Sequence, residues 1–110
     1  MALIEQHGAV SREVVEAMAR GALERSSADF ALSTSGIAGP AGGTEDKPVG
    51  TVWIGMAWRD DATPHVGARL ARLAGDRENI RDRSAKCALQ LLRLKLMDED
   101  LDQLKWASNP

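Results

Sequence analysis

The stretch from Val49 to Trp58 constrains the fold of this chain most, because apolar side chains occupy both of its alternating faces. Successive side chains of a β-strand point to opposite faces, so a strand with one solvated face shows only one apolar row. The apolar residues of the even-numbered face are Val52, Ile54, Met56 and Trp58. Those of the odd-numbered face are Val49, Trp53 and Ala57. The pattern predicts a strand that is covered on both sides.

Two amphipathic helices are available to supply this cover. Residues 12–26 carry an apolar stripe at helical spacing, and the hydroxyl of Ser11 suits the N-cap position before them. Residues 77–97 carry a second stripe, which follows the capping pair Gly75-Asp76. Gly21 lies inside the first helix, where glycine costs about 1 kcal/mol relative to alanine. We therefore expect Gly21 to pack closely against another element.

The remaining elements complete a layered domain. Residues 29–34 predict a buried strand, and residues 65–73 predict the antiparallel partner of the Val49 strand. The order helix, strand, loop, hairpin, helix predicts an α/β fold, a layered sheet with helices packed on it. Two helices barely cover both faces, so we expect part of the sheet to be missing. We assign residues 1–97 to this domain and residues 98–110 to an acidic C-terminal tail that frays or docks.

Charge and composition exclude several classes of protein. The 110 residues include 14 basic and 16 acidic side chains, for a net charge of −2, so we expect no nucleic-acid partner. No apolar run approaches the roughly 18 residues of a membrane span, and the start shows no signal-peptide pattern, so we expect no membrane partner and a cytoplasmic location. His7, His65 and Cys87 lack metal-ligand spacing, so we expect no metal and no cofactor. Cys87, on the apolar stripe of the second helix, is predicted to be an inert buried thiol.

The segment of residues 36–48 holds four glycines and two prolines and reads as a loop. It leaves the end of a predicted strand, where open α/β sheets bind ligands, and glycine lets main-chain N–H groups approach an anion. Its spacing matches neither the P-loop nor the G-x-G-x-x-G pattern. On this pattern alone, a plain turn is more common than a phosphate site.

Four motifs, in this order, resemble the C-terminal domain of the CinA family of competence/damage-inducible proteins. They are Gly8-Ala-Val-Ser11, the segment Ser35–Gly43, the segment Lys47–Val52, and Gly75-Asp-Arg77 with Ile80-Arg81. The resemblance covers residues 3–95. Two positions depart from the family pattern, since Ser35 replaces a usual threonine and Ala41 a usual glycine.

The resemblance implies a reaction, the hydrolysis of the carboxamide of nicotinamide mononucleotide to nicotinate mononucleotide and ammonia in pyridine-nucleotide salvage. It implies a serine nucleophile activated by a lysine, without metal or cofactor. In the family these groups precede the Gly-Ala-Val-Ser motif, in a Ser-Cys-Thr-Gly-Gly motif and a later Ser-Asn…Lys segment. Neither precedes Gly8 here. We therefore assign no catalytic residue and expect the chain alone to be an inactive, truncated domain.

The resemblance also assigns part of a pocket for nicotinamide mononucleotide or a related nucleotide. The assigned residues are Ser35, Gly36, Ala38, Gly39, Gly42, Gly43 and Arg77. The arginine fork suits a phosphate, although an ordinary surface residue at a helix start is the competing interpretation of Arg77. The alternative function is a non-catalytic, ligand-binding remnant that forms a homodimer through an uncovered sheet edge. A third interpretation is a fragment of a longer protein or a start codon placed too far downstream.

Overall fold

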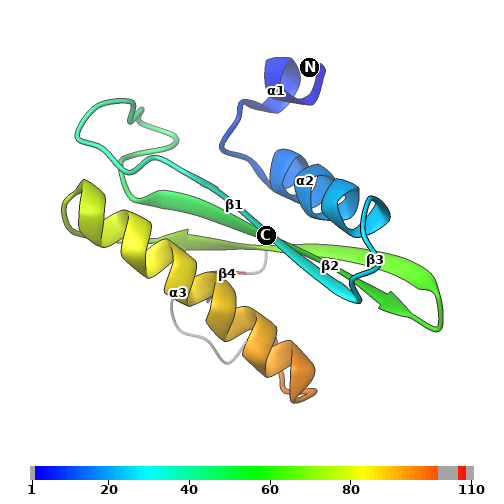
Figure 1. Ribbon diagram of the computed structural model, residues 1–110. Helices are drawn as coiled ribbons and strands as arrows, with labels where there is room; N and C mark the ends of the chain where they lie inside the picture. Colours follow the sequence, from blue (N-terminus) through cyan, green and yellow to red (C-terminus); the bar gives the residue numbers. More distant parts are fainter. Residues whose placement is uncertain (1, 102–106, 109–110) are drawn as a thin grey trace.

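The chain folds into an antiparallel sheet with α2 on one face and α3 on the other (Figure 1). The computed structural model describes residues 2–101 and 107–108. Its helices are α1 (Ala2–His7), α2 (Arg12–Glu24) and α3 (Arg77–Leu96). Its strands are β1 (Phe30–Gly36), β2 (Thr51–Asp60), β3 (Thr63–Arg72) and β4 (Ala107–Ser108), in the spatial order β1-β2-β3-β4. The predicted layered α/β fold is confirmed, and β1 forms an edge of the described sheet.

The hairpin of β2 and β3 is the centre of the sheet. The two strands pair from Asp60↔Thr63 to Thr51↔Arg72. Asp61 and Ala62 form the two-residue connection, and both have positive φ angles, of 49° and 70°. Such a connection matches the right-handed twist of the paired strands. The predicted return strand is confirmed, and it begins two residues earlier than expected.

Two separate apolar clusters explain why both faces of β2 are apolar. On the α2 face, Ala19 and Leu23 pack against Ala57, with Ala31 and Val66 beside them. The α3 face has the larger cluster, whose buried members are Val52, Ile54, Ala71, Leu73, Ile80, Cys87, Ala88, Leu91 and Leu94. The predicted double cover of this strand is confirmed, but the strand begins at Thr51, so Val49 lies outside it and is exposed.

The predicted caps are confirmed, but the expectation for Gly21 is wrong. Ser11 Oγ accepts a hydrogen bond from the N–H of Val14 (3.3 Å), and Asp76 Oδ1 accepts one from the N–H of Asn79 (2.9 Å). A Cβ added at Gly21 would meet no atom within 4 Å. Gly21 faces open space because it lies on the outer side of α2, next to Ala17 and Met18.

The described part of the tail lies against the domain. Leu101 packs on the cluster under α3, and the main chain of β4 pairs with Leu70 and Ala71 of β3. Within the described ranges, no helix is both long and apolar enough to cross a membrane.

Candidate functional site

The glycine-rich segment after β1 is a closed loop, residues 37–50, whose two ends are joined by main-chain hydrogen bonds. The N–H of Gly50 donates to the carbonyl of Ile37 (2.7 Å), and the N–H of Leu73 donates to the carbonyl of Gly50 (2.8 Å). Gly50 has a φ of 95°, and a Cβ at this position would overlap the carbonyl oxygen of Leu73. Only glycine fits at this junction without strain.

A lysine holds the far side of the loop. Lys47 Nζ donates to the main-chain carbonyl of His7 (2.8 Å), at the end of α1. The N–H of Lys47 donates to Thr44 Oγ1 (3.0 Å), and its carbonyl accepts from the N–H of Thr44 (2.9 Å). The loop is therefore anchored both to the sheet and to the end of α1.

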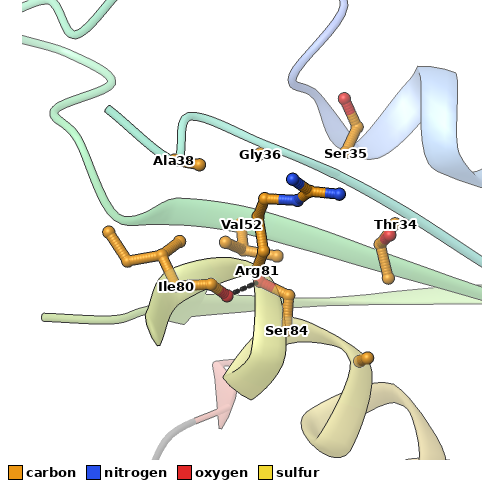
Figure 2. Close-up of a pocket in the computed structure, with 9 residues that line it drawn as sticks. Thr34, Ser35, Gly36, Ala38, Val52, Ile80, Arg81 and Ser84 are labelled. Atoms are coloured by element: carbon orange, nitrogen blue, oxygen red, sulfur yellow. Dashed lines mark hydrogen bonds between the residues drawn. The ribbon is translucent and has the colours of Figure 1, made fainter. Parts of the chain in front are cut away.

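A cavity of about 200 Å³ opens between the end of β1 and the first turns of α3 (Figure 2). Its lining residues are Thr34, Ser35, Gly36, Ala38, Val52, Ile80, Arg81, Ser84 and Ala85. The volume is below the roughly 300–1,000 Å³ that is usual for a site enclosing a small ligand. This cavity can therefore hold only part of such a ligand.

Arg81 supplies the positive charge of the cavity. Its side chain extends from α3 toward β1, in the direction of Ser35 (Figure 2). Arg81 is exposed and also lines a wider depression with Glu78, Asn79 and Asp82. No residue in the described part of the chain forms a hydrogen bond or ion pair with its guanidinium. Its N–H donors are therefore available to an anion.

The structure separates the sequence-predicted site residues into two groups. Ser35, Gly36 and Ala38 line the cavity, whereas Gly39, Gly42 and Gly43 do not. The missing Cβ of Gly43 gives room to the main chain of Val49 instead, since a Cβ there would lie 2.8 Å from its nitrogen.

Arg77 also lies outside the cavity lining and contacts the loop. Its Nη1 donates to the carbonyl of Gly39 (3.3 Å), which ties the start of α3 to the loop. Sequence reasoning selected Arg77 and did not select Thr34, Arg81 or Ser84. Arg81 lies one helical turn after Arg77, so it occupies the same side of α3, nearer to β1.

The two serine hydroxyl groups of the cavity are engaged in structural hydrogen bonds. Ser35 Oγ donates to the carbonyl of Ala9 (2.8 Å), and Ser84 Oγ donates to the carbonyl of Ile80 (2.6 Å). No lysine or histidine belongs to the lining of this cavity. A serine nucleophile needs a neighbouring base to remove its proton. These residues can bind an anion, but they form no activated nucleophile.

Other candidate chemistry is limited in the described ranges. Among residues 2–101 and 107–108, no three His, Cys, Asp or Glu side chains gather to hold a metal ion. Cys87 is a buried residue of α3, and this burial raises the pKa of its thiol, an effect that nearby Arg83 partly opposes. A raised pKa lowers the thiolate fraction, so Cys87 is a poor nucleophile.

Comparison with known families decides the assignment of the chain. The family model described as the CinA C-terminal domain matches residues 1–96. The chain belongs to the CinA C-terminal domain family. The predicted family resemblance is confirmed over almost the same residues.

Curated relatives from distant bacteria agree with this assignment. A CinA-like protein of Mycolicibacterium paratuberculosis is 52% identical over 98 residues, which are 88% of this chain and 23% of that protein. A putative competence-damage inducible protein of Caldicellulosiruptor bescii is 47% identical over 96 residues, 87% of this chain and 22% of that protein. The chain thus spans less than a quarter of the length of these CinA relatives.

Solved structures of CinA relatives share the fold. The competence/damage inducible protein CihA from Agrobacterium tumefaciens superposes with a TM-score of 0.74 at 36% identity, over 84% of this chain and 55% of that one. A competence-damaged protein (CinA) superfamily member from Escherichia coli gives a TM-score of 0.69 at 37% identity, over 86% of this chain and 53% of that one. Nearly half of each solved CinA relative therefore has no counterpart here.

Proposed function

We propose that this chain forms the substrate-anchoring wall of a CinA-type nicotinamide-nucleotide amidase. The reaction adds water across the C–N bond of the carboxamide of nicotinamide mononucleotide, which gives the carboxylate of nicotinate mononucleotide and ammonia. Membership of the CinA family supports this substrate, because the motifs carrying the resemblance include the loop and the start of α3.

The observation that carries the proposal is the position of Arg81 at a cavity beside the end of β1. A guanidinium binds phosphate through two parallel hydrogen bonds, and Arg81 has no protein partner among the described residues that competes. Gly36 also lines this cavity, and its missing Cβ gives room to Val52, since a Cβ there would lie 2.8 Å from Val52 Cγ2. We assign Arg81 to the phosphate of the nucleotide.

The apolar floor of the cavity suits the other end of the ligand. Val52 and Ile80 are almost completely buried and form this floor together with Ala38. A flat pyridine ring gains contact area on such a surface, while its carboxamide needs polar partners. Thr34 and Ser35 supply polar groups to the lining, and Ser35 Oγ, which donates to the carbonyl of Ala9, can still accept a hydrogen bond.

We infer that this chain by itself binds the nucleotide without hydrolysing it. The lining has no lysine to activate a serine, and the printed sequence lacks a Ser-Cys-Thr-Gly-Gly motif. The alternative of a non-catalytic ligand-binding module uses the same cavity and shares this expectation.

Calorimetric titration together with an ammonia assay tests the proposal. We expect the purified chain to bind nicotinamide mononucleotide, to bind nicotinamide riboside more weakly because it lacks the phosphate, and to release no ammonia. Equal affinity for the two ligands would contradict the assignment of Arg81 to the phosphate. Absence of nucleotide binding would contradict the proposed function, and ammonia release would show that the nucleophile lies within these residues.

A further inference from the structure

The outer edge of β3 is the side of this strand that faces away from β2. The N–H of Leu73, which follows β3, donates to the carbonyl of Gly50 on the β2 side. Because the direction of main-chain groups alternates along an antiparallel strand, those of the even-numbered residues of β3 point away from β2. These outward residues are Pro64, Val66, Ala68, Leu70 and Arg72.

Proline protects one end of this edge, and the C-terminal tail protects the other. Pro64 has no N–H to offer to another strand. Near the other end, β4 lies opposite Leu70 and Ala71. Between these positions, no strand in the described part of the chain pairs with the outer side of Val66 or Ala68. Removal of β4 would therefore leave most of the strand open.

A turn at the end of α3 reverses the chain before the tail. The N–H of Glu99 donates to the carbonyl of Leu94 (2.9 Å). The N–H of Asp98 donates to the carbonyl of Lys95 (3.1 Å), and Asp98 has a φ of 57°, which completes a Schellman motif. The match of the family model ends at residue 96, so this turn and the tail lie outside the part of the chain that it matches.

Leu101 holds the tail beside the sheet through an apolar contact. This side chain is half-buried and packs on the cluster under α3. With Gly67 of β3 and Leu91 of α3, it lines a small cavity of about 60 Å³. Beyond Leu101, the described pairing of the tail with the sheet is limited to the two residues of β4. Few contacts therefore hold the tail, and a longer strand can compete with it.

We propose that the outer edge of β3 is a strand-pairing surface, which the tail covers in the monomer and which a second copy of this chain occupies when the tail is displaced. The β3 strands of the two copies pair antiparallel and join the two sheets into one. The proposal rests on the fold and does not depend on the proposed amidase activity.

The outward groups of β3 are self-complementary about Ala68. A two-fold axis at Ala68 sets Val66 of one copy opposite Leu70 of the other, and Pro64 opposite Arg72. The carbonyl of Pro64 then accepts from the N–H of Arg72. The missing N–H of Pro64 costs one hydrogen bond at each end, and the other outward groups of the paired segments find partners.

Charge complementarity favours the same arrangement. The register set by this axis brings the hairpin connection of one copy beside Arg72 and Ala74 of the other. Asp60 and Asp61 are exposed at this connection, and Arg72 is exposed as well. Arg83 Nη1 donates to the carbonyl of Ala74 (3.2 Å), which adds a second positive charge there. The acidic turn of each copy thus lies near basic groups of the other.

Amide hydrogen exchange and light scattering test the proposal on the full chain and on a chain that ends at Asp100. The shortened chain keeps the turn after α3 but lacks Leu101 and β4. We expect the full chain to be a monomer in which the amide of Leu70 exchanges about tenfold more slowly than that of Val66. We expect the shortened chain to be a dimer in which the amide of Val66 exchanges about tenfold more slowly than in the full chain.

A substitution in the full chain gives the same readout if the shortened chain fails to fold. Leu101→Gln weakens the hold of the tail and should strengthen dimerisation about tenfold. The control is Leu89→Gln, because Leu89 is a leucine of α3 that is 61% exposed. Leu89→Gln should leave the full chain monomeric.

A second pair of variants tests the charge contact in the shortened chain. Asp61→Asn should weaken the dimer about threefold, because asparagine keeps the positive φ of the turn but loses the negative charge. Asp46→Asn makes the same change in net charge in the exposed loop of residues 37–50, and it should leave the dimer unchanged.

Three outcomes would overturn the proposal. The first is a folded, monomeric shortened chain in which the exchange of Val66 is unchanged. The second is a dimer that protects Leu32 and Thr34 of β1 and leaves Val66 unprotected, which would place the contact at the opposite edge of the sheet. The third is equal weakening of the dimer by Asp61→Asn and Asp46→Asn.

Discussion

Gly55 of β2 lies directly under the main-chain carbonyl of Val15 in α2. A Cβ at Gly55 would overlap the oxygen of Val15 and approach Ser33 Oγ to 2.5 Å. Ser33 Oγ donates a hydrogen bond to the same carbonyl oxygen at 2.6 Å, and this pair is buried. The absence of a side chain at Gly55 thus lets α2 rest on the sheet, and Ser33 fixes the helix there.

The substitution Gly55→Ala should destabilise the chain strongly. The new methyl group meets main-chain atoms of α2, which cannot move aside as the end of a flexible side chain can. We expect a loss of about 3 kcal/mol or more in the free energy of unfolding, the upper end of the usual effect of overpacking. Urea denaturation followed by circular dichroism measures this loss, and an unchanged midpoint would contradict the close contact.

The substitution Gly21→Ala is the matched test within α2, and it should stabilise the chain. A Cβ there meets no atom within 4 Å, and alanine restricts the unfolded chain more than glycine does. We expect a gain of about 0.5–1 kcal/mol in the same denaturation assay. A loss of stability would contradict this position of Gly21 and would indicate that it packs closely against another element.

The substitution Arg81→Gln should weaken binding of nicotinamide mononucleotide about tenfold, equivalent to about 1.4 kcal/mol. Glutamine keeps part of the length of the side chain but loses the charge and the paired donors that suit phosphate. Arg93→Gln is the control, because Arg93 is also an exposed arginine of α3, in its last turn. Calorimetry should show that Arg93→Gln leaves the affinity unchanged. Equal effects of the two changes would indicate general charge attraction.

Cys87 should react slowly with an aromatic disulfide reagent in the native state and quickly after unfolding. Burial raises the pKa of its thiol above the ordinary value of 9.0, so the native state favours the protonated form. The stability gained in this way is complete below the unfolded pKa and is lost as the pH rises toward the folded pKa. The difference in stability between the native chain and Cys87→Ala should therefore shrink above pH 9. A native reaction as fast as that of the unfolded chain would contradict this burial.

Elements with local signals were predictable from the sequence. Ser11 and Asp76 fix the starts of α2 and α3 through hydrogen bonds to residues three positions later, so the local sequence contains both partners. The apolar cover on both faces of β2 was also predictable, because the alternation of side chains within this one strand is enough to indicate it. The outward position of Gly21 depends instead on how α2 is rotated on the sheet, which its apolar stripe defines only approximately.

The candidate site was less predictable because it joins segments far apart in the sequence. Arg77 and Arg81 share one side of α3, and only the packing of α3 beside β1 determines which of them lies nearer the cavity. The spacing of four residues between them indicated that both arginines lie on one side of the helix, so that either could reach the site. The glycines at the end of β1 and in the loop differ for the same reason. Gly36 borders the cavity, whereas Gly43 makes room for Val49, a contact that its neighbours in sequence do not reveal.

The junction at Gly50 has a consequence for engineering. Its main chain is hydrogen-bonded to Ile37 on one side and to Leu73 on the other, so the base of the loop is closed independently of the residues at its tip. Segments grafted between Pro40 and Glu45 should therefore leave the register of the three long strands intact. Because this region lies outside the cavity lining, it can be exchanged while Gly36 and Ala38 keep their places at the cavity.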